Sequence, residues 1–322
     1  MHMLKTQARI RPRALRTGDT VAIVAPSGAV DPERLEYGTG LLTRLGFRSV
    51  VEPNISDRRG YLAGTSDQAS AAAFTRAFAD PDVSGIICAK GGYGAIRLLP
   101  YINWDAVRAN PKFFCGFSDI TAIHAAIRHE TGLVTFHGPM AALLLDEEVL
   151  PWNEQGLLAA MTSIQPLGTV ASPSGGPTVE TLITGQAEGE LEGGNLSLLA
   201  ALCGTPWQPD LRGRLLLVED VNEAPYRFDR MLTQLILAGA FEGVRGIVVG
   251  DSPTCDRPPS PRGLTLREVL LDRLGPLGVP MIYGFPCAHS AYRATLPLGV
   301  RAHLDADNST LTFLEGACVP GR

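Results

Sequence analysis

The sequence predicts an α/β fold built on a parallel sheet, and two observations support this prediction. In the first half of the 322-residue chain, short apolar runs alternate with segments that have the apolar spacing of helices. The apolar runs are continuous, which is typical of strands buried on both faces of a parallel sheet. We therefore expect helices to cover both faces of this sheet.

The expected strands of the first half each combine a continuous apolar run with glycine or polar residues at its end. They are residues 20–28, 48–53, 83–94, 112–119 and 133–139.

The expected helices between these strands have recognisable ends. The first, 31–47, begins with Asp31 and Pro32, and the second, 66–81, has a serine at its N-cap position. A third, 120–132, stops at Gly132, a residue that favours helix ends.

A segment rich in proline, glycine and serine, residues 165–180, interrupts the alternation and is interpreted as a linker. Strands are expected after it at 214–220 and 244–251, and helices at 227–241 and 264–278. The tail alternates like β structure with a turn at Asp307-Asn308. The expected organisation is an N-terminal α/β domain over 1–164, a linker over 165–180 and a C-terminal domain over 181–322.

Composition narrows the class of function. The net charge of -5 and the lack of a basic run argue against nucleic acid as a partner. No apolar stretch has transmembrane length, and the N-terminus has no apolar core of a secretory signal, so membrane insertion is not expected. The six cysteines form no C-x-x-C pair, which favours reduced thiols in the cytoplasm over a metal site.

In a parallel sheet, ligands bind outside the carboxyl ends of the strands. The residues that follow the expected strands carry hydroxyl, imidazole and carboxylate groups, or are glycines. They are Ser27-Gly28, Gly91-Gly92, Ser118-Asp119, His137-Gly138, Glu219-Asp220 and Asp251.

Ser118 lies on a sharp strand-to-helix turn, as the nucleophile of an α/β hydrolase does. The backbone N–H of Asp119 is then a natural oxyanion donor, and the glycines at 91 and 92 offer a second. The alternative is that Ser118 or Asp119 merely caps the following helix.

A serine nucleophile needs a base, and the base needs a carboxylate. His289 is chosen as the base because it lies in an irregular loop, whereas His137 is equally well a core histidine or a substrate contact. Glu219 ends an apolar strand and is the preferred carboxylate, with Glu223 as the nearest rival. The alternative for Glu219 is an ordinary ion pair with an arginine of the next helix.

The ordered set of motifs in this chain resembles the LD-carboxypeptidase family of serine peptidases, which includes muramoyl-tetrapeptide carboxypeptidases and microcin C self-immunity hydrolases. The motifs are VAIVAPSG, GYLAGTSDQ, AKGGYGAIRLLPYI, NPKFFCGFSDITAI, TFHGPM, EGGNLSLLAALCGTPW, LLLVEDVNEAPYRFDRML and TLPLGV.

The resemblance implies a Ser118–Glu219–His289 triad, with the backbone at Asp119 and Gly92 holding the oxyanion. It also implies a flavodoxin-like N-terminal domain, a smaller β-rich α/β C-terminal domain, a homodimer, and neither a metal nor a cofactor. The chain departs from the family at Lys90, where arginine is more usual, and before His289, where glycine is common.

The expected function is hydrolysis of the L,D-peptide bond that releases terminal D-alanine from a murein tetrapeptide. The expected substrate-binding residues are Gly91, Tyr93, His137 and Asn195. One alternative is hydrolysis of an aminoacyl-nucleotide amide, for which Trp152 or Trp207 could stack on the base. Another is a ligand-binding α/β protein without catalysis.

Overall fold

The computed structural model describes residues 8–53, 55–144, 151–256 and 262–321. The chain divides into two compact units. The first comprises residues 1–165, 295–299 and 316–322, and the second comprises 166–294 and 300–315.

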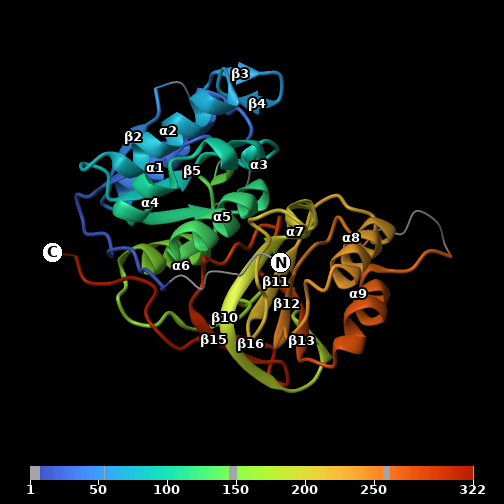
Figure 1. Cartoon of the computed structure of the whole chain (residues 1–322). Helices are drawn as coiled ribbons and strands as arrows, with labels where there is room; N and C mark the ends of the chain where they lie inside the picture. Colours follow the sequence, from blue (N-terminus) through green and yellow to red (C-terminus); the bar gives the residue numbers. More distant parts are fainter. Residues whose placement is uncertain (1–7, 54, 145–150, 257–261, 322) are drawn as a thin grey trace. The chain divides into compact units, whose positions relative to one another are not determined.

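A six-stranded sheet forms the centre of the first unit within the described residues, in the order β14-β7-β6-β5-β1-β2 (Figure 1). Its strands are β1 (Thr20–Val24), β2 (Arg48–Val51), β5 (Gly85–Cys88), β6 (Phe113–Gly116), β7 (Thr135–His137) and β14 (Leu296–Leu298). All pairs are parallel except β14 with β7. Numbered along the chain, the parallel strands run 2-1-3-4-5, the order of flavodoxin-like folds. The predicted fold of this part is confirmed.

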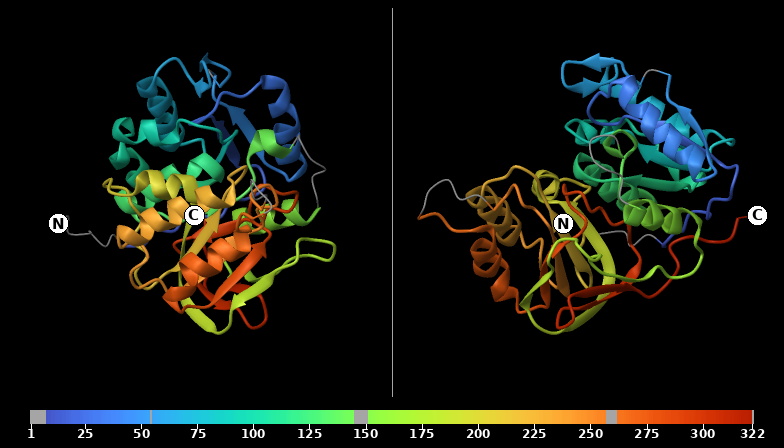
Figure 2. Two further views of the ribbon diagram at one scale, coloured as in Figure 1. Left: turned by 90° about the vertical axis from the view of Figure 1, so that its right-hand side faces the viewer. Right: turned by 180° about the vertical axis from the view of Figure 1, so that it is seen from behind.

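The helices of the first unit lie on both faces of its sheet (Figure 2). They are α1 (Pro32–Arg44), α2 (Asp67–Ala79), α3 (Ala95–Leu98), α4 (Trp104–Ala109), α5 (Thr121–Thr131) and α6 (Pro151–Thr162), with 3-10 turns η1 (Leu99–Tyr101), η2 (Ser118–Ile120) and η3 (Ala141–Leu144). The crossover from β1 to β2 through α1 moves toward the β2 edge of the sheet. The crossovers through α2, α4 and α5 move toward the opposite edge. Because such crossovers are right-handed, α1 lies on the face opposite to α2, α4 and α5.

Local sequence explains where these helices begin and end. The Ser66 side chain accepts a hydrogen bond from Ala69 N at 3.1 Å and caps α2. Gly132 ends α5 with a left-handed φ of 72°. A short hairpin of β3 (Arg58–Arg59) and β4 (Leu62–Ala63), which the sequence did not indicate, bridges to Gly28 after β1.

An eight-stranded mixed sheet forms the second unit within the described residues, in the order β8-β16-β15-β10-β11-β12-β13-β9. Its strands are β8 (Gly168–Val170), β9 (Glu180–Ile183), β10 (Gln186–Asn195), β11 (Leu215–Glu219), β12 (Gly246–Gly250), β13 (Met281–Phe285), β15 (Arg301–Asp305) and β16 (Thr310–Phe313). Strands β10 to β13 are parallel, and the flanking pairs are antiparallel. The prediction of a sheet-rich C-terminal domain is confirmed.

One face of the second sheet packs against helices. The helical elements are α7 (Leu196–Leu202), α8 (Pro225–Leu237), α9 (Leu266–Leu274) and the turn η4 (Gly275–Leu277). Figures 1 and 2 show α8 and α9 side by side, and their apolar residues share a core with Leu216 and Val218 of β11. Because strand side chains alternate, Glu219 lies on the face opposite to this core. Within the described ranges, every helix is too short or too polar to span a bilayer.

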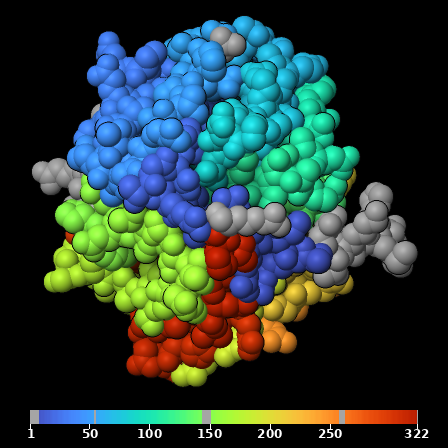
Figure 3. All heavy atoms as spheres, turned by 90° about the vertical axis from the view of Figure 1, so that its left-hand side faces the viewer, coloured from blue at the N-terminus to red at the C-terminus, as the bar shows by residue number. Residues whose placement is uncertain are grey.

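The division of the chain differs from the predicted boundaries in two places. The predicted linker contains β8, which pairs with β16. Residues 295–299 and 316–322, assigned by sequence to the second domain, belong to the first unit. The reasons are the β14–β7 pairing and two backbone hydrogen bonds of Val319, from Ala14 N and to Pro12 O, both 2.9 Å. Figure 3 shows the dark blue N-terminal segment at the surface beside red C-terminal residues.

Candidate active site

Ser118 occupies a strained turn at the end of β6. Its φ of 61° lies in the left-handed region that residues with side chains rarely adopt. Phe117 before it is extended, and the helix α5 begins at Thr121. Such a sharp turn between strand and helix is the backbone geometry that projects a serine hydroxyl in α/β hydrolases.

Gly91 brings its backbone close to Ser118. A β-carbon at residue 91 would stand 3.1 Å from Ser118 Cβ and 3.2 Å from its Oγ, which is tighter than ordinary contact. The Gly91 carbonyl accepts a hydrogen bond from Gly28 N at 3.0 Å, which ties the loop to the end of β1. Gly92 follows with φ of 110°, a conformation that favours glycine. Gly91 therefore lies against Ser118 within the first unit, and the expected approach of this backbone to a substrate oxygen stays a prediction.

Asp119 anchors the turn instead of capping a helix. Its buried carboxylate accepts hydrogen bonds from Ser27 Oγ at 2.5 Å and from Ala95 N at 2.8 Å. No side-chain cap forms at the start of η2 or α5 among the described residues. Burial raises the pKa of Asp119 above its ordinary value, while the hydrogen bonds from Ser27 and from backbone N–H groups lower it. The Asp119 side chain therefore joins the turn after β6 to Ser27 after β1 and to the first residue of α3, and its backbone N–H is not needed for that task.

Two histidines lie in the interior of the first unit. His124 contacts the Gly116 carbonyl through Nε2 at 2.9 Å, and burial lowers its pKa to about 3. His137, a predicted substrate-binding residue, is 1% exposed at the end of β7 and packs edge-to-face on Phe117. Both imidazoles are therefore enclosed by the sheet and α5.

Tyr93, another predicted substrate-binding residue, lies between Gly92 and the start of α3. It is 49% exposed and packs edge-to-face against Tyr61 of the β3–β4 hairpin, with ring centroids 5.6 Å apart.

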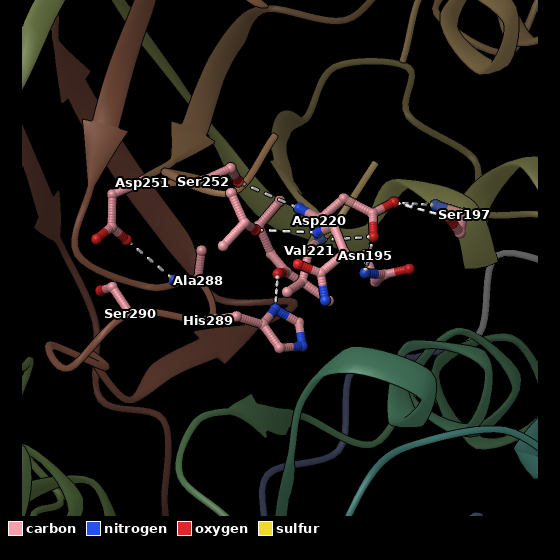
Figure 4. Close-up of polar contacts among 12 residues, drawn as sticks. Asn195, Ser197, Asp220, Val221, Asp251, Ser252, Ala288, His289 and Ser290 are labelled. Atoms are coloured by element: carbon pink, nitrogen blue, oxygen red, sulfur yellow. Dashed lines mark hydrogen bonds and ion pairs between the residues drawn. The ribbon is translucent and has the colours of Figure 1, made fainter. Parts of the chain in front are cut away.

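The second unit brings Glu219 and His289 together. Glu219, at the end of β11, is fully buried, and its Oε2 lies 2.7 Å from Nδ1 of His289 (Figure 4). The His289 side chain keeps 19% of its surface exposed. The chosen carboxylate thus contacts the chosen base, whereas the rival Glu223 pairs with Arg227 at 3.4 Å. The alternative of an arginine partner for Glu219 is wrong.

Asp220 and Asn195 support the neighbouring strand ends. The Asp220 carboxylate accepts hydrogen bonds from Asn195 Nδ2 at 2.9 Å, Ser197 N at 2.9 Å and Ser197 Oγ at 2.7 Å. Asn195 also accepts from Leu198 N at 3.3 Å and so caps α7. Burial, followed by the nearby Glu219, raises the pKa of Asp220. Asn195, expected to bind substrate, is 3% exposed and uses both ends of its amide within the protein.

Asp251 is the residue that sequence reasoning placed at a strand end without a role. It follows β12, is 8% exposed, and accepts a hydrogen bond from Ala288 N at 3.4 Å. Burial raises its pKa to about 6, and hydrogen bonding from Ser290 opposes this rise. Because Asp251 directly follows an apolar strand, the strand-end argument could have assigned it to the site.

The residues expected from sequence to act in catalysis are divided between the two units. Ser118, Asp119, Gly91 and Gly92 lie in the first, and Glu219 and His289 lie in the second. The two tryptophans considered for stacking are also divided, with Trp152 in α6 and the half-buried Trp207 after α7. Among the described residues, no group of three or more His, Cys, Asp or Glu side chains has the arrangement of a metal site.

Comparisons with known proteins agree with this division. A family model described as the LD-carboxypeptidase N-terminal domain matches residues 21–138, and one for the LD-carboxypeptidase C-terminal domain matches 188–304. A Bacillus subtilis protein named "Probable murein peptide carboxypeptidase" is 37% identical, over 95% of each chain.

Solved structures are also similar to this chain. The muramoyltetrapeptide carboxypeptidase of Oxalobacter formigenes has a TM-score of 0.79 and 29% identity, covering 94% of this chain and 100% of the other. The microcin C7 self-immunity protein MccF is known from Escherichia coli. Its structure in complex with glutamyl sulfamoyl guanosine has a TM-score of 0.89 against this chain. In that comparison it is 27% identical and covers 96% of this chain and 99% of its own.

Proposed function

The chain belongs to the LD-carboxypeptidase family and is a serine-type carboxypeptidase, and from this premise we propose its substrate and its catalytic residues. The proposed reaction is hydrolysis of the L,D-peptide bond of a murein tetrapeptide, with release of the terminal D-alanine. The proposed triad is Ser118, Glu219 and His289. The observation that carries it is the 2.7 Å contact between Glu219 Oε2 and His289 Nδ1.

This contact supports one assignment of the ring nitrogens. With Nδ1–H donating a hydrogen bond to the buried Glu219 carboxylate, Nε2 holds the lone pair that can accept a proton. Glu219 keeps the imidazole in this tautomer and stabilises the imidazolium that forms. A fully buried carboxylate does this strongly, because little water screens its charge.

The proposed steps follow from these roles. Ser118 Oγ attacks the carbonyl carbon of the L,D-bond, and its proton moves to His289 Nε2. The N–H groups of Asp119 and Gly92 stabilise the oxyanion of the tetrahedral intermediate. His289 then protonates the leaving amine, the C–N bond breaks and D-alanine departs. Water, deprotonated by His289, attacks the acyl-serine ester and regenerates Ser118.

The murein tetrapeptide is proposed because relatives over nearly the whole chain carry names with murein peptide or muramoyltetrapeptide substrates. The test is incubation of the purified protein with tetrapeptide and measurement of free D-alanine. Ser118→Ala should lower the rate at least ~10³-fold, because triad nucleophiles contribute on this order. The exposed Ser174→Ala is the matched control and should keep full activity. Equal D-alanine release by the Ser118 variant would contradict the assignment.

A second candidate substrate is an aminoacyl-nucleotide amide. The observation that favours it is the likeness to MccF, whose complex holds glutamyl sulfamoyl guanosine. The same triad would serve both reactions, so kcat/KM for the two substrate types decides between them. We expect the tetrapeptide to give the higher value, and a higher value for the nucleotide amide would reverse the proposal.

We also propose that the protein works as a homodimer, as the family resemblance implies, and in the cytoplasm, as its cysteine pattern indicates. Light scattering of the purified protein tests the oligomeric state, and a monomer at micromolar concentration would contradict it.

A further inference from the structure

The loop that carries His289 is held by a second carboxylate besides Glu219. Residues 286–294 form this loop, and its base is closed by a hydrogen bond from Ala294 N to Pro286 O at 2.7 Å. Glu219 contacts the imidazole ring and leaves the backbone of the loop to other partners. The backbone on each side of the histidine therefore needs its own restraint if the ring is to stay in one place.

Asp251 supplies this restraint from the adjacent strand. Its Oδ1 accepts from the N–H of Ala288, the residue before His289, at 3.4 Å. The hydroxyl of Ser290, the residue after His289, donates to the Tyr292 carbonyl at 3.3 Å and also acts on the Asp251 carboxylate, whose pKa it lowers. Figure 4 shows Asp251 facing Ala288 and Ser290, with the His289 ring turned toward the other side.

Close packing at Gly250 makes this arrangement possible. A β-carbon at residue 250 would lie 2.9 Å from the β-carbon of Glu219 and 3.0 Å from that of Ala288. The register of β12 against β13 also shifts between Val249 and Gly250, which redirects the end of the strand. Asp251 N then donates to the Phe285 carbonyl at 2.9 Å, which fastens the carboxylate to the start of the loop.

We propose that Asp251 is a positioning residue for catalysis, whose carboxylate holds the Ala288 N–H before His289 and faces the Ser290 side chain after it, so that the imidazole stays against Glu219. This inference rests on the proposed function, because it assumes that His289 is the base. Neighbouring strands β11 and β12 thus contribute one carboxylate each, the first to the ring and the second to its loop.

The experiment measures the rate at which a fluorophosphonate probe labels Ser118, together with kcat and KM for the tetrapeptide. Asp251→Ala should lower the labelling rate and kcat by ~10- to 100-fold with little change in KM, because a displacement of about 1 Å costs this much. Asp251→Asn retains an acceptor oxygen for Ala288 N and should stay within about threefold of the wild type. Asp256→Ala is the matched control, since Asp256 also accepts a backbone N–H, from Leu266 at 2.8 Å, but is exposed and outside the loop.

A spectroscopic readout separates positioning from loss of fold. The downfield proton NMR signal of His289 Nδ1–H should be present in wild type, Ser118→Ala and Asp251→Asn, and weakened or shifted in Asp251→Ala. If Asp251→Ala does not fold, Ser290→Ala takes its place, with an expected loss of about threefold. Wild-type labelling and an unchanged signal in the folded Asp251→Ala or Ser290→Ala variant would overturn the inference.

His289→Ala distinguishes this failure from failure of the proposed function. If His289→Ala labels like the wild type, the triad itself is wrong, and the role of Asp251 fails with it. If His289→Ala loses labelling while Asp251→Ala keeps it, the triad stands and the positioning role is wrong.

Discussion

The two units hold the proposed catalytic residues in different ways. In the first, Ser118 and its surroundings depend on backbone conformation: a positive φ at the serine, and glycines whose missing side chains leave room beside it. In the second, Glu219, Asp220 and Asp251 are buried side chains at strand ends. Glu219 contacts the His289 ring, and Asp251 accepts the N–H of the preceding Ala288.

This difference predicts which substitutions each unit should tolerate. A nucleophile positioned by the backbone is sensitive to added volume, because close-packed neighbours cannot move aside without shifting it. A base positioned by buried carboxylates is sensitive to removal of charge or of an acceptor, because the partner is then left without compensation. The first unit also has a buried carboxylate, that of Asp119. It accepts hydrogen bonds from Ser27 and Ala95, and neither it nor Ser118 caps the start of α5.

The largest expected effect comes from removing charge in the second unit. Glu219→Gln should lower kcat/KM by about 10³- to 10⁴-fold, because an amide allows the wrong imidazole tautomer and does not stabilise the imidazolium. Glu223→Gln is the matched control, since Glu223 pairs with Arg227 and not with His289. Tetrapeptide kinetics on both variants measure the effect, and a Glu219 variant as active as its control would remove this residue from the mechanism.

Added volume in the first unit should have the next largest effect. Gly91→Ala would place a β-carbon 3.2 Å from Ser118 Oγ, and the small displacement of the nucleophile should lower kcat by about 10²-fold. Gly156→Ala is the matched control, because a β-carbon there in α6 meets nothing within 4 Å. Labelling of Ser118 by the fluorophosphonate probe measures the outcome, and equal rates in both variants would show that residue 91 tolerates volume.

The smallest expected effect is on stability, as a dependence of the free energy of unfolding on pH. Because burial raises the pKa of Asp251 to about 6 from an ordinary 3.8, the folded chain binds this proton more tightly than the unfolded chain. The neutral form makes its full contribution to the free energy of unfolding below pH ~4. This contribution, up to ~3 kcal/mol, is lost as the pH rises through ~6. The Arg293 charge favours the ionised form and limits the loss.

Asp251→Asn removes this titration. The free energy of unfolding of the variant minus that of the wild type should therefore rise between pH 4 and pH 7, as measured by denaturant unfolding at each pH. Asp256→Asn is the matched control at an exposed carboxylate, measured in the same way. A flat difference for Asp251→Asn would mean that this carboxyl group titrates normally in the folded chain.

Much of the fold could be predicted from local sequence. Apolar runs and helix signals placed β1, β5, β6, β11 and β12 within a few residues, and Ser66 and Gly132 lie at the helix ends that they indicated. These signals work because burial on a sheet or helix imposes a periodicity that short segments already carry. The β3–β4 hairpin and β8 were missed because their strands are only two or three residues long.

The candidate site was predicted in part by the same logic. Parallel strands end at one edge of a sheet, so the strand pattern by itself marks the residues after them as candidates. That reasoning selected Ser118, Glu219 and Asp251, and the choice of His289 came from its place in an irregular loop. It also selected His137, which is buried and packed within its own unit. Asn195, which was expected to bind substrate without that argument, is buried and hydrogen-bonded within its own unit.

The sequence by itself determined most of the longer elements, the strand-end residues and the family resemblance. Tertiary structure alone decided that Glu219 meets His289 and not an arginine, that β14 joins the sheet of the first unit, and that Asp251 faces the residues on both sides of His289. The physical reason is separation along the chain. Glu219 and His289 are 70 residues apart, and local periodicity carries no information about which distant strand ends and loops come together.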